Sequence, residues 1–447
     1  MKNYYIIFLF FLSSIAQAQI VNIPDSNFLD VLVNTNCVDT NGDGYGDSPA
    51  DTNNDGQIQV IEAEAVIGLI VGDYQLVTSL EGIQSFTNLE NLNVKLNALT
   101  ELEVSQNTNL KFLNCDYNEI ASLDLSQNLS LEKLSCVQNH FLATLILPQN
   151  INFKELSVSE NLLTSLDITQ YPNLELLWCN SNQLTELDVS QNPNLKILGF
   201  SGNQITNIDV TQNANLESLS CSYNQLSELD VTQNTILESL SCDENSLTNL
   251  DISQNPLLKT LTCSENLLTS LDLSQNTRFE YFQCKGNLLT SLDLSQNTML
   301  QELFCDENNL TYLNIRNGNN HNMTSMYAYN NPNLNIIMVD CDDDANNKDC
   351  YEDRWCKDST ATYTGDCTLG TEDFQDVQFT LYPNPTQNIL SIDSPEPFNS
   401  VRIYSITGSL IKETSNSQVD VSSLASGIYF VKVYKQGRNS TKKVVKI

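Results

Sequence analysis

Leucine and other apolar residues recur at fixed positions along the middle of the chain. From Leu216 the sequence reads LESLSCSYNQLSELDVTQNTI, and from Leu237 it reads LESLSCDENSLTNLDISQNPL, so the pattern repeats every 21 residues. Self-similarity at such a period predicts a solenoid of stacked coils. One asparagine marks each coil, with a single inserted residue before Asn161, and it occurs at Asn97, Asn118, Asn139, Asn161, Asn182, Asn203, Asn224, Asn245, Asn266, Asn287 and Asn308.

Each repeat contains the same short sequence motif twice. The first copy in one coil places Leu219 and Cys221 on one side with Ser220 between them, and the second copy does the same with Leu229 and Val231. Alternation over so few positions predicts two very short strands, each followed by a bend. Stacked coils would then form two narrow parallel sheets. The marker Asn is expected inside, where its amide bonds backbone groups that the bends leave without ladder partners.

The repeated phrase LxxLxCxxNxLTxLDVSQN resembles the leucine-rich repeats of internalin-like surface proteins, in particular the nested 21-residue class of secreted Bacteroidetes-type proteins. The resemblance covers residues 76–340, more than half of the chain. It implies a mainly β fold, a leucine-rich-repeat solenoid, used for adhesion or for recognition of an extracellular protein or glycan. It implies no particular ligand.

The first 18 residues have the layout of a secretory signal peptide. Lys2 precedes an apolar run that extends to Ile15, and the small-residue site Ala16-Gln17-Ala18 follows. We therefore expect residues 1–18 to be removed. No later apolar stretch reaches the roughly 20 residues needed to cross a bilayer, so no transmembrane segment is expected.

Residues 19–75 are predicted to form an N-terminal cap with a helix over 24–33 and a calcium-binding loop. The stretch 51–62 matches the twelve-residue loop of an EF-hand, with Gly56 at the sharp turn. Its expected ligands are Asp51, Asn53, Asp55, Gln57, Gln59 and Glu62. A bound Ca²⁺ would have a structural role, because it would order the cap that covers the open end of the solenoid.

A related stretch lies directly before this loop. Asp39, Asn41 and Asp43 repeat the first half of the pattern without a glutamate at the twelfth position, and the stretch resembles the calcium repeats of thrombospondin type 3. A second ion is therefore a weaker expectation. The alternative for both stretches is an Asp/Asn/Gly-rich turn without an ion.

The cysteines fall into two groups. Eight occupy one repeat position, where other coils have Val158 and Phe200, and are predicted to be buried free thiols rather than a disulfide ladder. They are Cys115, Cys136, Cys179, Cys221, Cys242, Cys263, Cys284 and Cys305. Four more follow the last repeat, and their spacing favours two disulfides over zinc, with no pairing assigned. These are Cys341, Cys350, Cys356 and Cys367, in a predicted C-terminal cap and linker, 341–376.

Two outward rows differ in character. The second half-repeat carries a column of carboxylates, here named the Asp column: Asp124, Asp167, Asp188, Asp209, Asp230, Asp251, Asp272 and Asp293. Mutual repulsion is expected to raise some of their pKa values or to recruit cations or a basic partner. The alternative is a solvated face that opposes aggregation, held by hydroxyls three residues earlier, such as Thr185.

The first half-repeat places apolar residues where most coils have Ser, Thr or Asn. We predict a partner-binding surface at Leu176, Trp178 and Ile197, with further contacts at Tyr281 and Phe304. Exposed apolar clusters that contain Trp are typical of recognition sites. The alternative is local packing under a loop.

Residues 377–447 lose the repeat and read as a small β-sandwich. The blocks LYPNP, VRIYSITGSLIK and SSLASGIYFVKV, with the Lys-rich end, resemble the type A C-terminal sorting domain of type IX secretion. That resemblance implies a partner, the type IX machinery, and a secreted or outer-membrane cell-surface location. An ordinary carbohydrate-binding or fibronectin-like domain is the alternative.

The net charge and the lack of catalytic motifs exclude two classes of function. The net charge is −34, yet residues 377–447 hold eight Lys and Arg against four Asp and Glu. A nucleic-acid partner is excluded, since it needs a basic face. No nucleophile motif accompanies the two histidines, so no enzyme is expected. Two hypotheses remain: a non-catalytic adhesin for protein or glycan, or a structural, acidic, calcium-binding surface-coat protein without a specific partner.

Overall fold

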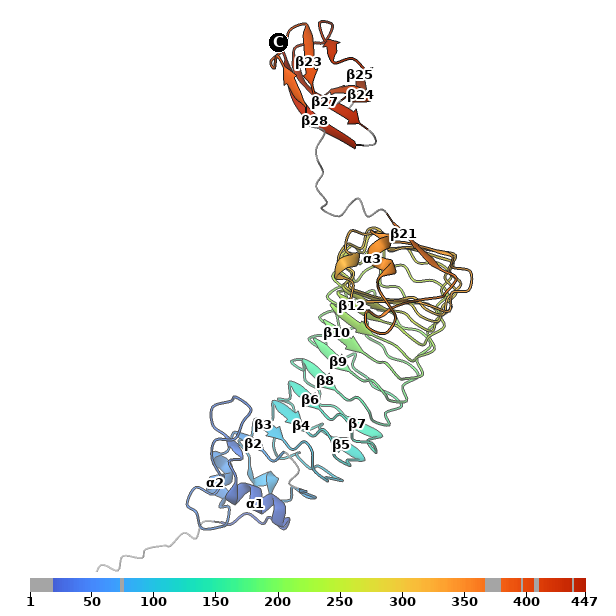
Figure 1. The fold of residues 1–447 in the computed structure, drawn as a ribbon. Helices are drawn as coiled ribbons and strands as arrows, with labels where there is room; N and C mark the ends of the chain where they lie inside the picture. The colour runs from blue at the N-terminus through green and yellow to red at the C-terminus, as the bar shows by residue number, and fades with distance from the viewer. Residues whose placement is uncertain (1–18, 73–75, 366–378, 395–396, 406–409, 436–437) are drawn as a thin grey trace, which may run out of the picture. The chain divides into compact units, whose positions relative to one another are not determined.

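The computed structural model describes residues 19–72, 76–365, 379–394, 397–405, 410–435 and 438–447. The chain divides into two compact units, Met1–Cys367 and Thr368–Ile447, which are both drawn in Figure 1. The predicted signal peptide, the prediction for Cys367 and the predicted boundary at residue 376 lie outside the described residues.

The N-terminal cap contains two short helices, α1 (Ser26–Asn34) and α2 (Val60–Ala65), and a 3-10 turn, η1 (Ile83–Ser85). Helix α1 begins after Asp25, whose side chain accepts the N–H groups of Asn27 and Phe28. It therefore starts two residues later than predicted, because an Asp that caps orphan amides fixes a helix start. Phe28 and Leu32 are fully buried and join the solenoid core.

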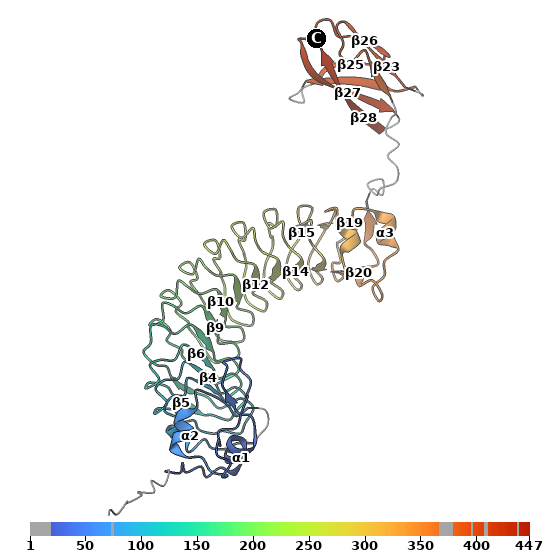
Figure 2. The ribbon, with the colours of Figure 1, turned by 90° about the vertical axis from the view of Figure 1, so that its left-hand side faces the viewer.

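One long sheet runs through the first unit. Its strands follow one another in sequence order, and all pairs are parallel except β1–β2. Equivalent residues of successive coils pair, as Leu198 does with Leu177 and Leu219. Figure 2 shows this sheet on the inner, concave side of the curved stack. The strands are β1 (Val38–Asp39), β2 (Gly68–Ile70), β3 (Asn91–Asn93), β4 (Phe112–Asn114), β6 (Lys133–Ser135), β8 (Glu155–Ser157), β9 (Leu176–Trp178), β10 (Ile197–Gly199), β11 (Ser218–Ser220), β12 (Ser239–Ser241), β13 (Thr260–Thr262), β14 (Tyr281–Gln283), β16 (Glu302–Phe304), β18 (Ser325–Ala328) and β20 (Trp355–Lys357).

The predicted second sheet forms only at the two ends of the array. One pair consists of β5 (Ser122–Asp124) and β7 (Thr144–Ile146), and one four-stranded sheet consists of β15 (Ser291–Asp293), β17 (Tyr312–Asn314), β19 (Ile336–Met338) and β21 (Thr362–Thr364). The prediction of a continuous second sheet was therefore wrong. Figure 2 shows the coils spread apart on the outer side of the curve. A strand ladder needs a spacing of about 4.8 Å, which a curved stack keeps only on its inner side.

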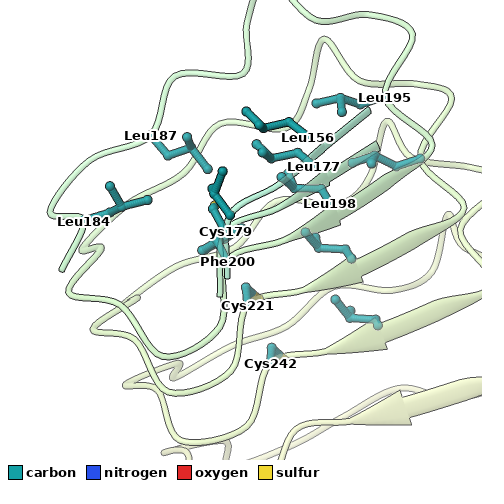
Figure 3. Packing of buried hydrophobic residues seen from close by; sticks show 14 of the residues in the cluster. Leu156, Leu177, Cys179, Leu184, Leu187, Leu195, Leu198, Phe200, Cys221 and Cys242 are labelled. Carbon is teal, nitrogen blue, oxygen red and sulfur yellow. The ribbon is translucent and has the colours of Figure 1, made fainter. Parts of the chain in front are cut away.

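The core of the solenoid is a repeated layer of leucines and one column of thiols. Figure 3 shows Cys179, Phe200, Cys221 and Cys242 one above the other, next to the leucines of the long sheet. All eight column cysteines are free and fully buried, as predicted. Phe200 occupies the same slot and is also fully buried, which confirms that the position is a core position.

The buried thiols lead to a prediction about reactivity and pH. Burial raises the pKa of Cys179 from 9.0 to about 12. We expect the column not to react with a water-soluble disulfide reagent in the folded protein, since the thiolate is the reacting form.

The same pKa shift makes stability depend on pH. Because the pKa of Cys179 is higher in the folded than in the unfolded chain, the contribution of the neutral thiol to stability is complete below pH 9. It declines as the pH rises toward about 12. Thiol titration with and without denaturant, and alkaline unfolding, would test both statements; rapid labelling of the folded protein would contradict the first.

The marker asparagines form a buried ladder between coils. Nδ2 of Asn266 donates to the carbonyls of Cys242, Cys263 and Ser264 at 2.9, 3.2 and 3.0 Å, and its Oδ1 accepts the N–H of Leu247 at 2.9 Å. The residue before it, Glu265, has φ 51°. This left-handed bend turns backbone groups inward, and the marker amide pairs them, which confirms the predicted role of the marker.

The solenoid closes at its C-terminal end around Trp355. Nζ of Lys348 lies 4.1 Å from the Trp355 ring centroid and donates to the carbonyl of Asn320. Cys350 and Cys356 form a disulfide with Cα atoms 4.5 Å apart, and Cys341 is also disulfide-bonded. The sequence left this pairing open. Two short helical segments, α3 (Asp342–Asn346) and η2 (Asn320–Asn322), complete the cap.

The second unit consists of two antiparallel sheets. One contains β22 (Thr380–Tyr382), β23 (Ile389–Asp393) and β26 (Gln418–Asp420), and the other β25 (Leu410–Thr414), β24 (Ser400–Ser405), β27 (Gly427–Lys435) and β28 (Arg438–Lys446). Buried residues of both sheets, such as Leu390 and Val431, join one core, as in the predicted sandwich. Within the described residues, no helix is long and apolar enough to cross a membrane.

Candidate functional site

The loop 51–62 is folded around two acidic side chains. The buried carboxylate of Asp51 accepts the N–H groups of Asn54 at 2.7 Å and Gly56 at 2.8 Å. The buried carboxylate of Glu62 closes the loop, because it accepts the N–H of Thr52 at 2.8 Å. Asp51, Gln59 and Glu62 are therefore buried, whereas the other predicted ligands, Asn53, Asp55 and Gln57, are exposed. Gly56 at φ 80° permits the turn.

The stretch 39–47 repeats this geometry. Asp39 accepts the N–H groups of Gly42 and Gly44, as Asp51 does in the second loop. Its closing group is Asp47, which accepts both the N–H and the hydroxyl of Thr40 at 2.9 and 2.6 Å. Sequence reasoning missed Asp47, since it stands at the ninth position of the loop and not at the twelfth. The equivalent pair of bonds, from Thr52 to Glu62, is the signal that identifies it.

The carboxylate and amide oxygens of both loops are suitable ligands for a hard cation, although they are not arranged as a complete coordination shell. Among the described residues, no group of three His, Cys, Asp or Glu side chains is arranged to hold a metal ion. Asp51 and Glu62 are nevertheless buried, and neither forms an ion pair in the described part of the chain. Buried carboxylates without a basic partner fit Ca²⁺, which takes oxygen ligands and tolerates varied geometry.

The Asp column behaves differently from the prediction. The carboxylates of Asp188 and Asp209 each accept two hydrogen bonds from the Ser or Thr two residues later. One comes from the hydroxyl, and the other from the backbone N–H at 2.9 Å in both cases. These hydrogen bonds lower the pKa of Asp188 and Asp209, and mutual repulsion is a smaller effect for Asp188. The expected rise was therefore wrong, and the stabilising hydroxyls are not those three residues earlier. The same direction holds for Asp124, Asp167, Asp251 and Asp272.

The structure brings Leu176, Trp178 and Ile197 together, and we name them the Trp178 cluster. Leu176 and Trp178 are the outward residues of β9, and Ile197 of β10 pairs directly with Leu176. All three are half-buried on the concave sheet face. Gly199 pairs with Trp178, and a Cβ on Gly199 would lie 2.1 Å from the indole Cε3. The indole therefore rests in the space that this glycine leaves.

This contact gives a prediction for Gly199. Replacement of Gly199 by Ala should push the indole away from the sheet, because the added Cβ overlaps the ring. We expect a red-shifted tryptophan emission and stronger quenching by iodide, with little change in far-UV circular dichroism. Trp355 is buried in the cap and supplies a constant background. An unchanged spectrum for Gly199→Ala would contradict the seating of Trp178 on Gly199.

Tyr281 and Phe304 belong to a longer row, the aromatic strip, which also includes Tyr327 and Tyr329. The ring centroids of Tyr281 and Phe304 lie 5.5 Å apart, those of Phe304 and Tyr327 lie 5.1 Å apart, and Tyr327 meets Tyr329 edge-on at 6.3 Å. All four are half-buried. The last two escaped sequence reasoning because the repeat lengthens here: Cys305 and Ala328, which occupy equivalent coil positions, are 23 residues apart.

A buried acid lies beside the aromatic strip. Burial raises the pKa of Asp306, whose carboxylate lies 3.9 Å from Nζ of Lys285 and is hydrogen-bonded by Tyr329. Lys285 also pairs with Glu307 at 3.3 Å. The strip therefore combines an apolar row with polar groups at one edge, as recognition surfaces do. It does not meet the Trp178 cluster, since three strands, β11 to β13, lie between β10 and β14.

Comparison with known proteins gives a family match for the second unit and the fold of the first. Residues 380–447 match the family model described as "Secretion system C-terminal sorting domain". The chain is similar in structure to the functional domain of InlJ from Listeria monocytogenes, described as including a cysteine ladder, with 24% identity over 96% of this chain and 98% of that chain and a TM-score of 0.53. No curated protein matches the sequence.

Two further solved structures share the fold. The internalin InlF from Listeria monocytogenes has 18% identity over 76% of this chain and 96% of that chain, with a TM-score of 0.52. YopM, a leucine-rich effector protein from Yersinia pestis, has 23% identity over 66% of this chain and 83% of that chain, with a TM-score of 0.50. The chain is a leucine-rich-repeat solenoid of internalin-like fold that ends in a type IX secretion sorting domain, which engages the secretion machinery and directs the protein to the cell surface or outside the cell.

Proposed function

We propose that the protein is a non-catalytic recognition protein whose concave sheet binds an extracellular protein. The observation that carries this proposal is the pair of half-exposed apolar groups, the Trp178 cluster and the aromatic strip, on one face of one sheet. Bulky apolar residues on a solvent-facing strand layer are costly unless a partner covers them. A rigid stack of coils also holds them in place, so little side-chain entropy is lost on binding.

A protein fits the aromatic strip better than a glycan does. Sugars stack on the open face of an aromatic ring, and both faces of Phe304 are covered, by Tyr281 at 5.5 Å and by Tyr327 at 5.1 Å. The ring edges and the tyrosine hydroxyls remain for contact. Such edges and hydroxyls suit the side chains and backbone of a protein partner.

The test is retention of extracellular proteins by the immobilised full-length chain. Proteins from the culture medium and cell surfaces around the producing bacterium would be identified by mass spectrometry, with Trp178→Ser and Phe304→Ser as variants. The control is Phe112→Ser, which removes a half-buried aromatic from the same sheet face outside both groups. We expect loss of one or more specific proteins with the first two variants alone. Equal retention by all four forms would overturn the proposal.

The second candidate function is that of a calcium-dependent surface-coat protein. It is supported by the Asp column and by the loops 39–47 and 51–62. We infer that the loops 39–47 and 51–62 bind structural Ca²⁺, since each folds around the carboxylate of its first Asp, a hard oxygen donor. A coat role predicts self-association of the full-length chain on addition of Ca²⁺, without a retained partner. Light scattering in Ca²⁺ and in chelator distinguishes this outcome from specific retention.

A further inference from the structure

The part of the concave sheet between the Trp178 cluster and the aromatic strip has a distinct surface. Strands β11, β12 and β13 present only hydroxyl side chains outward, and we name these six residues the hydroxyl stretch: Ser218, Ser220, Ser239, Ser241, Thr260 and Thr262. From Ile197 to Tyr281 there are four strand steps, which span about 19 Å at roughly 4.8 Å each. Bulky apolar residues therefore flank a surface of short side chains on both sides.

Acidic charge is in surplus on the part of this sheet that begins at the hydroxyl stretch. Counted from one residue before each strand to three after it, β11 to β14 carry six carboxylates and two lysines. The same count over β3 to β10 gives six carboxylates and five lysines, and many of those pair, as Lys196 does with Glu175 at 2.7 Å. The surplus therefore begins at the hydroxyl stretch and continues to β16, where the same count gives three carboxylates and no lysine. It is absent from β3 to β10.

Three of these carboxylates lie together after β12 and β13. Asp243 accepts the N–H of Ser264 at 2.7 Å and the hydroxyl of Ser222 at 3.2 Å, so it is held in place at the edge of the stretch. Glu244 and Glu265 follow their strands and are exposed. In the described part of the chain, none of the three forms an ion pair with a basic side chain. Fixed acids without counter-charges attract a cationic partner.

We propose that the hydroxyl stretch and the two apolar groups beside it form one site for a basic segment of a protein partner. The segment would place an apolar side chain on the Trp178 cluster and another on the aromatic strip, with Lys or Arg over Asp243, Glu244 and Glu265. If it is helical, about 13 residues separate the two anchors, since a helix rises about 1.5 Å per residue. This inference rests on the proposed function and adds the chemistry of the partner.

The probe is a fluorescent, helix-forming synthetic peptide with one Trp near each end, about 13 residues apart, and Lys at outward positions between them. Its charge control replaces every Lys by Glu, and its spacing control moves both Trp to one end. Binding to the full-length chain would be measured by fluorescence anisotropy at low and physiological salt. We expect the Lys peptide to bind at least ~10-fold more tightly than either control, and more weakly at physiological salt because of screening.

The variant Asp243→Asn/Glu244→Gln/Glu265→Gln should weaken binding of the Lys peptide about 10-fold. A matched variant removes three charges from the outer side, Asp209→Asn/Asp230→Asn/Asp251→Asn, and should leave binding unchanged. Equal binding of the Lys and Glu peptides, or equal effects of the two triple variants, would overturn the inference. If the inference fails while Trp178→Ser still abolishes partner retention, the proposed function stands and only the basic chemistry is wrong. If neither Trp178→Ser nor Phe304→Ser affects either assay, both fall.

Discussion

Excess chelator is expected to lower the thermal midpoint of the full-length protein, and restored Ca²⁺ is expected to raise it again. An ion bound only to the folded loop stabilises it by about 2.7 kcal/mol when its free concentration is about 100 times Kd. In a unit of this size, that free energy corresponds to a shift of roughly 5 °C. The loss should be local, since the loop 51–62 contacts α1 through the Asp51 N–H, which donates to the Leu32 carbonyl at 3.3 Å, and runs directly into α2. Faster proteolysis within residues 19–72 would report it directly.

The matched variants are two glutamates of the same helix. Glu62→Gln removes the closing carboxylate of the loop, whereas Glu64→Gln changes an exposed side chain two residues later. The quantity to compare is the difference between the midpoints in Ca²⁺ and in chelator. We expect this difference to become smaller in Glu62→Gln, with the remainder due to the loop 39–47, and to persist in full in Glu64→Gln. A wild-type midpoint that is the same in both buffers would rule out structural calcium.

The loops also show where sequence reasoning reaches its limit. Ligand types and order were readable at 51–62, because each position of a twelve-residue loop has its own chemistry. Asp47 was not readable, since its role depends on a fold that returns it to Thr40. Whether Ca²⁺ binds either loop stays a prediction.

The solenoid itself was largely predictable from its period. A 21-residue repeat with Leu, Cys and Asn at constant positions specifies coils, a core column and an inner ladder, because each coil needs its neighbours to bury its apolar side. The curvature was not predictable from the repeat. It results from packing of the whole stack, and it removes the outer ladder between β7 and β15.

The surface was predictable only in part. Trp178 stood out against Ser and Thr at equivalent positions, but its seat on Gly199 depends on the pairing of neighbouring strands. Tyr327 was hidden by the break in the repeat after Cys305. For the Asp column, the repeated Asp suggested repulsion, whereas the local hydrogen bond to residue i+2 decides the pKa direction.

Replacement of Asn266 by Ala is expected to cost more stability than replacement of Asn255 by Ala, although both side chains are buried. Asn266 pairs four backbone groups, and its loss leaves them in the core at about 1–3 kcal/mol for each one that water does not reach. Asn255 belongs to a second column and donates only to the carbonyls of Val231 and Asn234. Its Oδ1 has no partner in the described structure.

This difference decides the relative size of the two losses. Asn255→Ala removes two hydrogen bonds but also removes a buried, unpaired carbonyl, whose desolvation already burdens the folded state. Asn266→Ala removes no unpaired polar atom, so nothing offsets the hydrogen bonds that it loses. Urea unfolding of both variants, with exposed Asn249→Ala as the control, should show a loss for Asn266→Ala at least about twice that for Asn255→Ala. Equal losses would mean that the marker amide acts as core volume, and that the left-handed bends before it do not depend on its hydrogen bonds.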